Sequence, residues 1–276
     1  MSLKIFYLTT EIIPFANTSS LAAFSAKVPL LLQNKQHDIR TIIPKYGYVS
    51  ERKYILREVI RLREIPFEFG EEDVITSAKS AFIPKTRVQV YFLEDDKRFK
   101  PLTNLIYKAK NGRVITDNDM RFAYFSKASL AILPHLFWRP DVIWCNDWQS
   151  ALVPAFYKQQ YANDEFYAGM KSVLVVHNYE KEFLAISKNT FKNTGLEEPA
   201  SMKKGVVNAY EAAAEYVDLI IAIDSPNKQV SKKILELPAI KKNKSKVLTI
   251  KIADDESPDY DKVAARIDDR LQKLFS

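Results

Sequence analysis

Short apolar runs alternate with stretches of helical periodicity along most of the chain. The apolar runs are rich in valine and isoleucine and fall at residues 4–10, 38–44, 88–93, 141–145, 172–177, 218–223 and 247–252. Helical spacing begins at Leu21 and recurs over residues 116–133, 150–161, 203–216 and 226–235. Near-continuous apolar strands are typical of parallel strands that are buried on both faces. The alternation predicts an α/β fold with an open, doubly wound, Rossmann-like parallel sheet of about six or seven strands.

Two regions depart from this alternation. Residues 46–100 are irregular and contain possible strands or a hairpin insertion at 55–69 and 74–83. Residues 253–258 form an acidic linker, and residues 261–274 place Val263, Ile267, Leu271 and Leu274 on one stripe of a helix. We therefore expect one domain over 1–252, followed by a linker and an amphipathic helix over 253–276. That helix either packs back on the domain or docks a partner.

Composition excludes several classes of function. The chain has 6 glycines, and no two lie closer than ten residues. Neither GxGxxG nor GxxxxGK[ST] is therefore present. The single cysteine excludes a disulfide framework, and the scattered His37, His135 and His177 suggest no metal cluster. No run of 18 apolar residues and no signal peptide is present, so we expect a cytoplasmic protein without a membrane partner.

Net charge is +7, and the densest basic run is residues 241–246. Because the positive charge is not gathered in one arm, we interpret this run as a solvated loop and expect no nucleic-acid partner.

Polar side chains follow four of the predicted strands, where open α/β sheets bind their ligands. The sets are Thr10 and Glu11 with the 17–20 loop; Asn146, Asp147, Trp148 and Gln149; His177 and Asn178; and Asp224 and Ser225. We expect all four sets to line one cleft. Amides and an indole suit the hydroxyls and the apolar face of a sugar ring. The helix that starts after Ser20 favours an anion at its N-terminus.

Several motifs carry a resemblance to a known family. Residues 5–15 (IFYLTTEIIPF) match its SE-x-x-P-F loop, and 38–46 (DIRTIIPKY) match D-V-R-V-x-x-P-x-Y. Residues 117–122 (DNDMRF) match D-N-x-x-R-F, 137–149 (FWRPD…NDWQ) match W-x-P-D…H-D-W-H, and 175–178 (VVHN) match T-x-H-N. From Lys4 to about Leu248, the chain resembles the N-terminal domain of bacterial glycogen synthase and plant starch synthase. These are retaining glucosyltransferases with the two-domain GT-B fold, so the resemblance implies one half of that fold.

The resemblance also implies roles for individual residues. His177 and Asp147 match catalytic positions. The positions that line the acceptor glucan and the reacting sugar are matched by Trp148, Asn178, Asn146, Gln149, Asp117, Asn118, Arg121 and Glu11. The phosphate loop Lys-Thr-Gly-Gly-Leu-x-Asp is degenerate here and reads Asn17, Thr18, Ser19, Ser20, Leu21, Ala22 and Ala23. The lysine that meets the donor's phosphates is replaced by Asn17, and the two glycines are replaced by serines. A Cβ at a position that needs positive φ costs on the order of 1 kcal/mol and blocks close approach.

The family's C-terminal domain, which holds most of the ADP-glucose site, is expected to be absent. No arginine–lysine pair and no E-x7-E region follow residues 247–248. The resemblance implies transfer of glucose from ADP-glucose to an α-1,4-glucan, with no metal or other cofactor. ADP-glucose would serve as donor only if a second domain or a partner chain is present.

Three functions stay open. The chain is the acceptor-side half of a transferase that is very weak alone and needs a separate donor-domain chain. Alternatively, it is a non-catalytic module that binds an α-glucan or maltooligosaccharide or regulates such an enzyme. A third possibility is a nucleotide-binding scaffold in which the helix start at Ser19 and Ser20 still holds a phosphate. Titration with maltooligosaccharides and with ADP-glucose separates the three.

Overall fold

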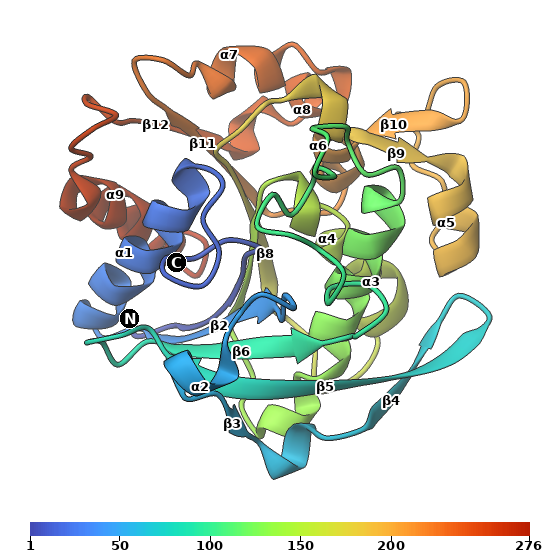
Figure 1. Ribbon diagram of the computed structural model, residues 1–276. Coiled ribbons are helices and arrows are strands. Elements are labelled where there is room, and N and C mark those ends of the chain that lie inside the picture. Colours follow the sequence, from blue (N-terminus) through green and yellow to red (C-terminus); the bar gives the residue numbers. More distant parts are fainter.

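A ten-stranded sheet forms the centre of the computed structural model, which describes residues 1–276 (Figure 1). Seven neighbouring strands are parallel, in the order β12 (Val247–Lys251), β11 (Leu219–Asp224), β8 (Lys171–Val176), β7 (Val142–Asn146), β1 (Lys4–Leu8), β2 (Asp38–Pro44) and β6 (Gln89–Glu94). Each of the seven coincides, to within a few residues, with one of the predicted apolar runs. The α/β fold with a doubly wound parallel sheet is confirmed.

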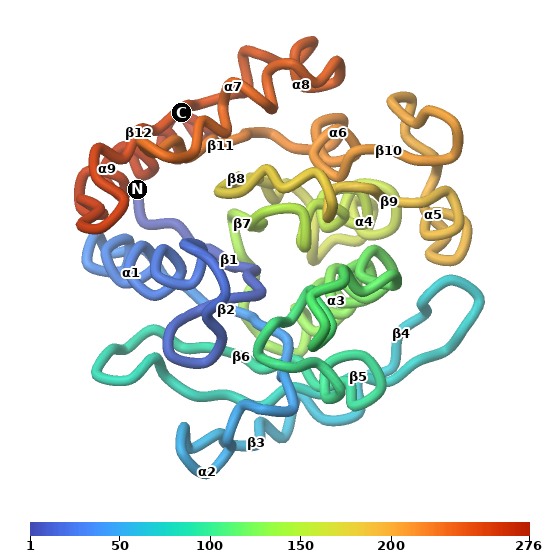
Figure 2. The backbone as a smooth tube through the Cα atoms, turned by 45° about the horizontal axis from the view of Figure 1, so that its top comes forward, coloured from blue at the N-terminus to red at the C-terminus, as the bar shows by residue number.

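Alternation along each strand sends successive side chains to opposite faces of the sheet. On β1, Ile5 and Tyr7 join one buried cluster, whereas Phe6 and Leu8 join the other. The first face is covered by α1 (Ser20–Asn34) and α9 (Tyr260–Gln272), which lie side by side in Figures 1 and 2. The second face is covered by α3 (Asn118–Ala131), α4 (Val153–Phe156), α5 (Lys188–Thr194), α6 (Ala209–Ala214), α7 (Val230–Leu235) and α8 (Pro238–Lys242).

The amphipathic helix expected near the C-terminal end is α9. Its stripe of Val263, Ala264, Ile267 and Leu271 is buried in the same cluster as Phe24 and Val28 of α1. Of the two alternatives for this helix, the structure therefore shows packing back on the sheet domain.

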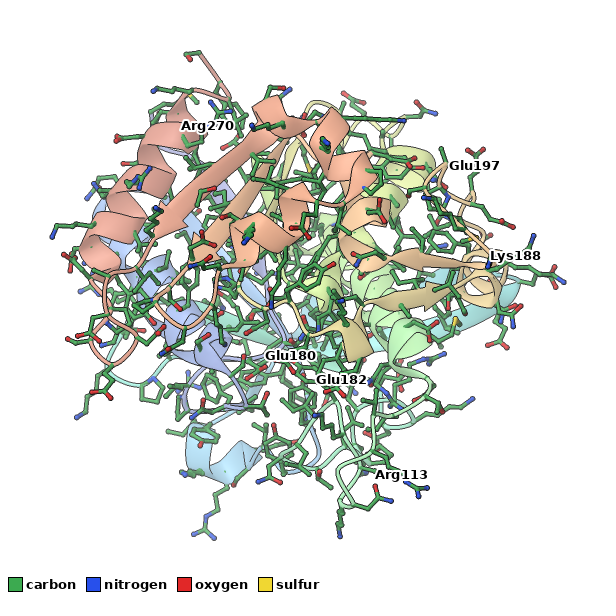
Figure 3. All side chains as sticks on the ribbon, turned by 90° about the horizontal axis from the view of Figure 1, so that it is seen from above. Arg113, Glu180, Glu182, Lys188, Glu197 and Arg270 are labelled. Atoms are coloured by element: carbon green, nitrogen blue, oxygen red, sulfur yellow. The ribbon has the colours of Figure 1, made fainter.

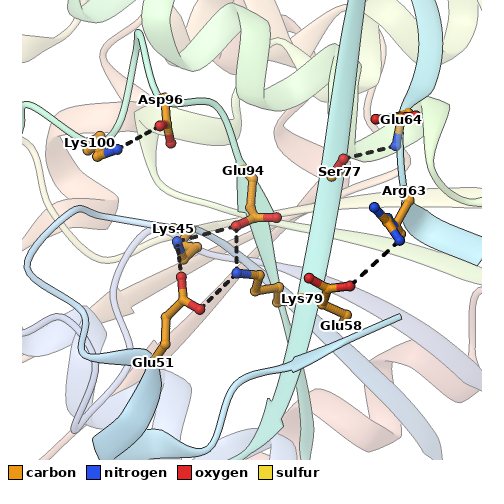
Figure 4. A network of polar contacts seen from close by, with 10 residues as sticks. All are labelled: Lys45, Glu51, Glu58, Arg63, Glu64, Ser77, Lys79, Glu94, Asp96 and Lys100. Atoms are coloured by element: carbon orange, nitrogen blue, oxygen red, sulfur yellow. Dashed lines mark hydrogen bonds and ion pairs between the residues drawn. The ribbon is translucent and has the colours of Figure 1, made fainter. Parts of the chain in front are cut away.

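The irregular region 46–100 forms the antiparallel edge of the sheet. Its longest strand, β5 (Glu72–Phe82), pairs with β6 and also with β4 (Ile65–Phe69) and β3 (Arg57–Glu58). A short helix, α2 (Glu51–Tyr54), is tied to this edge by four side chains (Figure 4). Glu51 pairs with Lys45 (2.5 Å) and Lys79 (2.8 Å), and both lysines also contact Glu94. The predicted hairpin is present as β4 and β5, but most of residues 55–64 lie outside strands.

Two predicted helices begin later than expected. Residues 203–216 contain the strand β10 (Val206–Asn208), which pairs with β9 (Ala185–Ser187), before α6 begins. In residues 226–235 the helix begins only at Val230, because a tight turn closes between Ser225 and Lys228 with backbone N–H···O distances of 2.8 and 3.0 Å. None of the helices combines the length and the apolar character that crossing a membrane requires.

Candidate functional site

The carboxyl ends of β1, β7 and β8, which are neighbours in the sheet, open into a cleft of about 210 Å³. The side chains that line it come from four segments: Glu11, Thr18 and Ser19; Leu105, Tyr107 and Lys108; Trp148 and Gln149; and Asn178, Glu180 and Phe183. Glu180 and Glu182 follow β8 and lie close together in the view from above (Figure 3). Three of the four predicted sets of residues therefore contribute to this cleft.

Gln149 is the polar side chain of this cleft that the protein leaves unsatisfied. It follows β7 in the 3-10 turn Trp148–Ser150 and is 3% exposed. No hydrogen-bond partner lies within reach of its buried Oε1 atom. A buried amide without a partner loses on the order of 1–3 kcal/mol relative to one that is paired. Gln149 therefore carries a buried acceptor without a partner at the wall of the cleft.

Aromatic rings pack behind the cleft. Trp148 stacks on Phe183 with ring centroids 5.5 Å apart and planes 7° from parallel, and it makes T-shaped contacts with Phe122 and Tyr107. Trp148 is 7% exposed, so little of its indole is open to a ligand. This differs from the expectation that the indole face receives a sugar ring, because Phe183, a residue that the motifs did not indicate, covers that face.

Asp147 forms hydrogen bonds to the segment that follows β8. Its Oδ1 accepts the N–H groups of His177 (2.6 Å) and Asn178 (3.1 Å), and its Oδ2 accepts the Asn178 side-chain amide (2.9 Å). Burial raises the pKa of Asp147 to about 7, although these hydrogen bonds act in the opposite direction. Its φ of +52° is strained for a residue with a Cβ and is held by the surrounding contacts. Asp147 lines neither the cleft nor the larger space beside it, and its hydrogen bonds make it a residue that positions His177 and Asn178.

His177 is a neutral imidazole. Burial, with the nearby charge of Lys228, lowers the pKa of His177 to about 3. Its Nε2 lies 3.3 Å from Asn146 Oδ1, an oxygen that already accepts the indole N–H of Trp144. Nε2 must therefore carry the proton and donate it, which leaves Nδ1 as an acceptor without a partner in the protein. Asn146 itself is fully buried and bonds to the backbone of Leu8.

The Glu11 carboxylate accepts hydrogen bonds from the loop that precedes α1. Its Oε2 accepts the backbone N–H groups of Thr18 (2.5 Å) and Ser19 (2.8 Å), and its Oε1 accepts the hydroxyls of Ser19 (3.1 Å) and Tyr107 (3.0 Å). Four donors thus converge on one carboxylate that is 1% exposed. An anion of the protein thus occupies the two backbone N–H groups that directly precede α1.

The serines of this loop keep ordinary backbone geometry. Ser19 is extended, with φ −147° and ψ 176°, and its Oγ caps α1 by accepting from Leu21 N–H. No residue from Asn17 to Ser20 has positive φ. Thr18 and Ser19 line the cleft, whereas Ser20 faces away from it and Asn17 is exposed. The loop therefore lacks the conformation in which glycines would bring backbone close to a phosphate.

The predicted residues of α3 lie outside the cleft. Asn118 donates to the backbone oxygen of Tyr107 (3.0 Å), and Arg121 pairs with Asp117 (2.7 Å) and bonds to the backbone oxygen of Arg98. The Asn118 bond fixes the segment that carries Tyr107 into the cleft, whereas Arg121 joins Asp117 to the loop of Arg98.

The four sets of residues do not share one cleft. His177, Ser20 and Ser225 line a second cavity of about 390 Å³, on the other side of the 17–20 loop. Asp224 caps α7 by accepting Ser231 N–H (2.7 Å) and its hydroxyl (2.5 Å). The expectation of one cleft is wrong because the start of α1 and Asn178 stand between the two spaces.

Sequence reasoning also missed contributing residues. Tyr107, Phe183 and Lys228 reach the two spaces from loops without a recognisable motif. Lys228 alone had a usable signal, since it follows the strand β11 by four positions, at the edge of the sheet where ligands bind.

Comparison with known proteins gives consistent matches. The family model for the starch synthase catalytic domain matches residues 4–230. The glycogen synthase of Chlorobium limicola is 32% identical over 220 residues, which cover 79% of this chain and 45% of that protein. The glycogen synthase of Chlorobium luteolum is 35% identical over 175 residues, which cover 63% and 36%.

A solved structure shares the fold. The catalytic domain of starch synthase IV from Arabidopsis thaliana, bound to ADP and acarbose, superposes with a TM-score of 0.74 at 21% identity. The superposition covers 91% of this chain and 51% of that one. The chain thus spans about half the length of the glycogen synthases and of the starch synthase that it matches.

Proposed function

Because the chain belongs to the starch synthase catalytic domain family, we propose that it is the acceptor-binding half of a glycogen or starch synthase-type glucosyltransferase. In this proposal the cleft holds an α-glucan or maltooligosaccharide, to which glucose is transferred from ADP-glucose. The chain covers about half of its relatives, so the donor-binding half is supplied by a second domain or a partner chain.

Gln149 is the observation that supports the acceptor. A sugar hydroxyl both donates and accepts, so one hydroxyl satisfies the buried Oε1 that the protein leaves without a partner. Around Gln149 the cleft is lined by Asn178, by Lys108, which pairs with Glu182 (2.8 Å), and by the apolar side chain of Leu105. Apolar walls with a few convergent polar groups are what a sugar-binding site needs.

The Glu11 loop supports the proposal that the 276-residue chain transfers glucose only very weakly by itself. In retaining transfer the diphosphate leaves, and stabilising its charge is the largest contribution that such a site makes. Here the N–H groups of Thr18 and Ser19 bond Glu11 instead. The same observation favours a second candidate function, a non-catalytic module that binds α-glucan.

Titration of the purified chain with maltoheptaose, followed by calorimetry or NMR, tests the acceptor site. The substitution Gln149→Ala removes one neutral hydrogen bond and should weaken binding by roughly 2- to 12-fold. Gln33→Ala is the matched control, because Gln33 lies at the far end of α1 and should leave binding unchanged. Absence of maltoheptaose binding in the wild-type chain would contradict the proposal.

Transfer assays with ADP-glucose separate the two candidate functions. Weak transfer by the chain alone that rises when a donor-binding partner is added supports the transferase half. Glucan binding without any transfer, even with such a partner, supports the non-catalytic module. Robust transfer by the purified chain alone would refute the interpretation of the Glu11 loop.

A further inference from the structure

Large apolar side chains are exposed along one edge of the sheet. Four of them, at or beside the short strand β3, are 57–86% exposed: Ile55, Ile60, Phe82 and Phe137. Among the other large apolar residues, only the first methionine and Ile75 of β5 exceed 45% exposure. Single exposed apolar residues are ordinary, but a group of them marks a surface that meets another protein. None of the four lines the cleft or the second cavity.

Two of these side chains lie at each end of β3. Ile55 precedes Arg57 by two positions, and Phe82 lies equally far beyond the β5 residue that pairs with Arg57. At the other end, Ile60 begins a 3-10 turn that lies against the turn preceding Phe137. The edge therefore has an apolar group at each end, with two charged residues between the groups.

The outer edge of β3 has no strand beside it. β3 pairs with β5 alone and is the last strand on its side of the sheet, at the lower edge of the view in Figure 1. Backbone groups on such an edge can pair with a strand of another chain, and many proteins prevent this with charged side chains or proline. The isoleucines at positions 55 and 60 have the opposite effect, because they add apolar surface at both ends of the strand.

The sequence of this edge complements itself. Two copies of a strand that pair antiparallel are related by a two-fold axis, so the same residues meet in both directions. With the axis between Arg57 and Glu58, each Arg57 lies opposite Glu58 of the second copy, and Ile55 lies opposite Ile60 of the second copy. Opposite charges and apolar pairs across antiparallel strands are both stabilising. A register shifted by one residue would instead place Arg57 opposite Arg57, or Glu58 opposite Glu58.

The other charges of this edge oppose association at low salt. Within residues 52–64, the exposed charged side chains besides Arg57 and Glu58 are Arg52, Lys53, Arg61, Arg63 and Glu64. The whole chain also carries a net charge of +7. Salt screens repulsion between exposed charges, with a range of about 10 Å at 0.1 M, and leaves apolar contacts in place. Because four cations stand against one carboxylate, screening removes more repulsion than attraction.

We propose that two copies of this chain form a two-fold symmetric dimer through the β3 edge. β3 of each copy pairs antiparallel with β3 of the other, so the two sheets continue into one another. Ile60 and Phe137 of one copy then lie beside Ile55 and Phe82 of the other. The dimer is independent of the proposed function, because no residue of this edge lines the cleft.

Sedimentation velocity of the 276-residue chain at micromolar concentrations tests the dimer. Wild type should approach twice the mass of one chain as its concentration rises, and should do so at lower concentration when salt is added. Ile60→Asp should raise the dissociation constant roughly 100-fold, because each dimer loses two buried isoleucines. Val206→Asp is the matched control, since Val206 is exposed on β10 in the separate two-stranded sheet and should leave association unchanged. Both residues are exposed in the single chain, so neither substitution removes a core contact.

A charge exchange tests the register of the two strands. Arg57→Glu should raise the dissociation constant roughly ten-fold, because it places two pairs of like charges across the interface. Adding Glu58→Arg to this variant should restore the association of wild type, because opposite charges then face each other again.

Four results would overturn the dimer as assigned. They are a wild-type chain that keeps the mass of one copy at every concentration, a dimer that dissociates as salt rises, no greater weakening by Ile60→Asp than by Val206→Asp, and failure of Glu58→Arg to restore the association that Arg57→Glu removes.

Discussion

Replacing Glu11 by glutamine tests whether one carboxylate holds the start of α1. In the wild-type chain, Oε2 accepts two backbone N–H groups and Oε1 accepts two hydroxyls. Glutamine can place its carbonyl oxygen at the Oε2 position and its amide nitrogen at the Oε1 position, where the hydroxyls of Ser19 and Tyr107 rotate and accept. The side chain therefore still fits, and what it loses is its charge.

The expected change in the free energy of unfolding follows from the loss of this charge. Each hydrogen bond to a charged group contributes about 1.5–3 kcal/mol and each neutral one about 0.5–1.5 kcal/mol, so two backbone bonds lose about 2 kcal/mol. A negative charge near a helix N-terminus adds about 0.3–1 kcal/mol, which glutamine also forfeits. We expect Glu11→Gln to lower the free energy of unfolding by about 2–3 kcal/mol.

Urea denaturation followed by circular dichroism measures this change. Glu180→Gln is the matched control, because Glu180 lines the same cleft but is exposed, and it should change stability by less than about 0.5 kcal/mol. If Glu11→Gln is no more destabilising than Glu180→Gln, the carboxylate does not hold the loop. Glu11 would then not take the place of a phosphate at this loop.

Two further predictions concern stability. Because the pKa of Asp147 is raised in the folded state, this residue stabilises the fold at acid pH, and the effect is lost as pH rises from about 4 to about 7. Because the pKa of His177 is lowered in the folded state, this residue destabilises the fold as pH falls from about 6.5 to about 3. Each pKa shift changes the free energy of unfolding by on the order of 4 kcal/mol, and the two changes have opposite signs. We therefore expect Asp147→Asn to make unfolding more sensitive to acid and His177→Gln to make it less sensitive, as measured by urea midpoints across this pH range. Parallel pH profiles of the two variants would contradict this expectation. Ile267→Ala on the buried stripe of α9 should lower the free energy of unfolding by about 2–5 kcal/mol. A change as small as that of the exposed Lys262→Ala would show that α9 contributes little to the core.

Much of the fold could be predicted because buried parallel strands leave a strong local signal. Residues 38–44, for example, are mostly buried and form β2 with the predicted bounds. The antiparallel edge could not be predicted in the same way, because β5 is half-exposed and its pairing with β4 depends on contacts along the whole hairpin. The turn at Pro226 was also missed, since proline suits a tight turn and a first helical turn equally well.

For the site, the sequence alone determined which residues follow the strand ends, because parallel strands bring their carboxyl ends to one edge of the sheet. It also determined that position 17 carries no cation and that positions 19 and 20, where the resemblance implies glycines, are serines.

Only the tertiary structure decided which residues these groups meet. Glu11 bonds the loop that lies seven and eight positions later, Phe183 covers the indole of Trp148, and Lys228 approaches Ser20 across 208 positions. Such contacts depend on how distant segments pack, which no local pattern encodes.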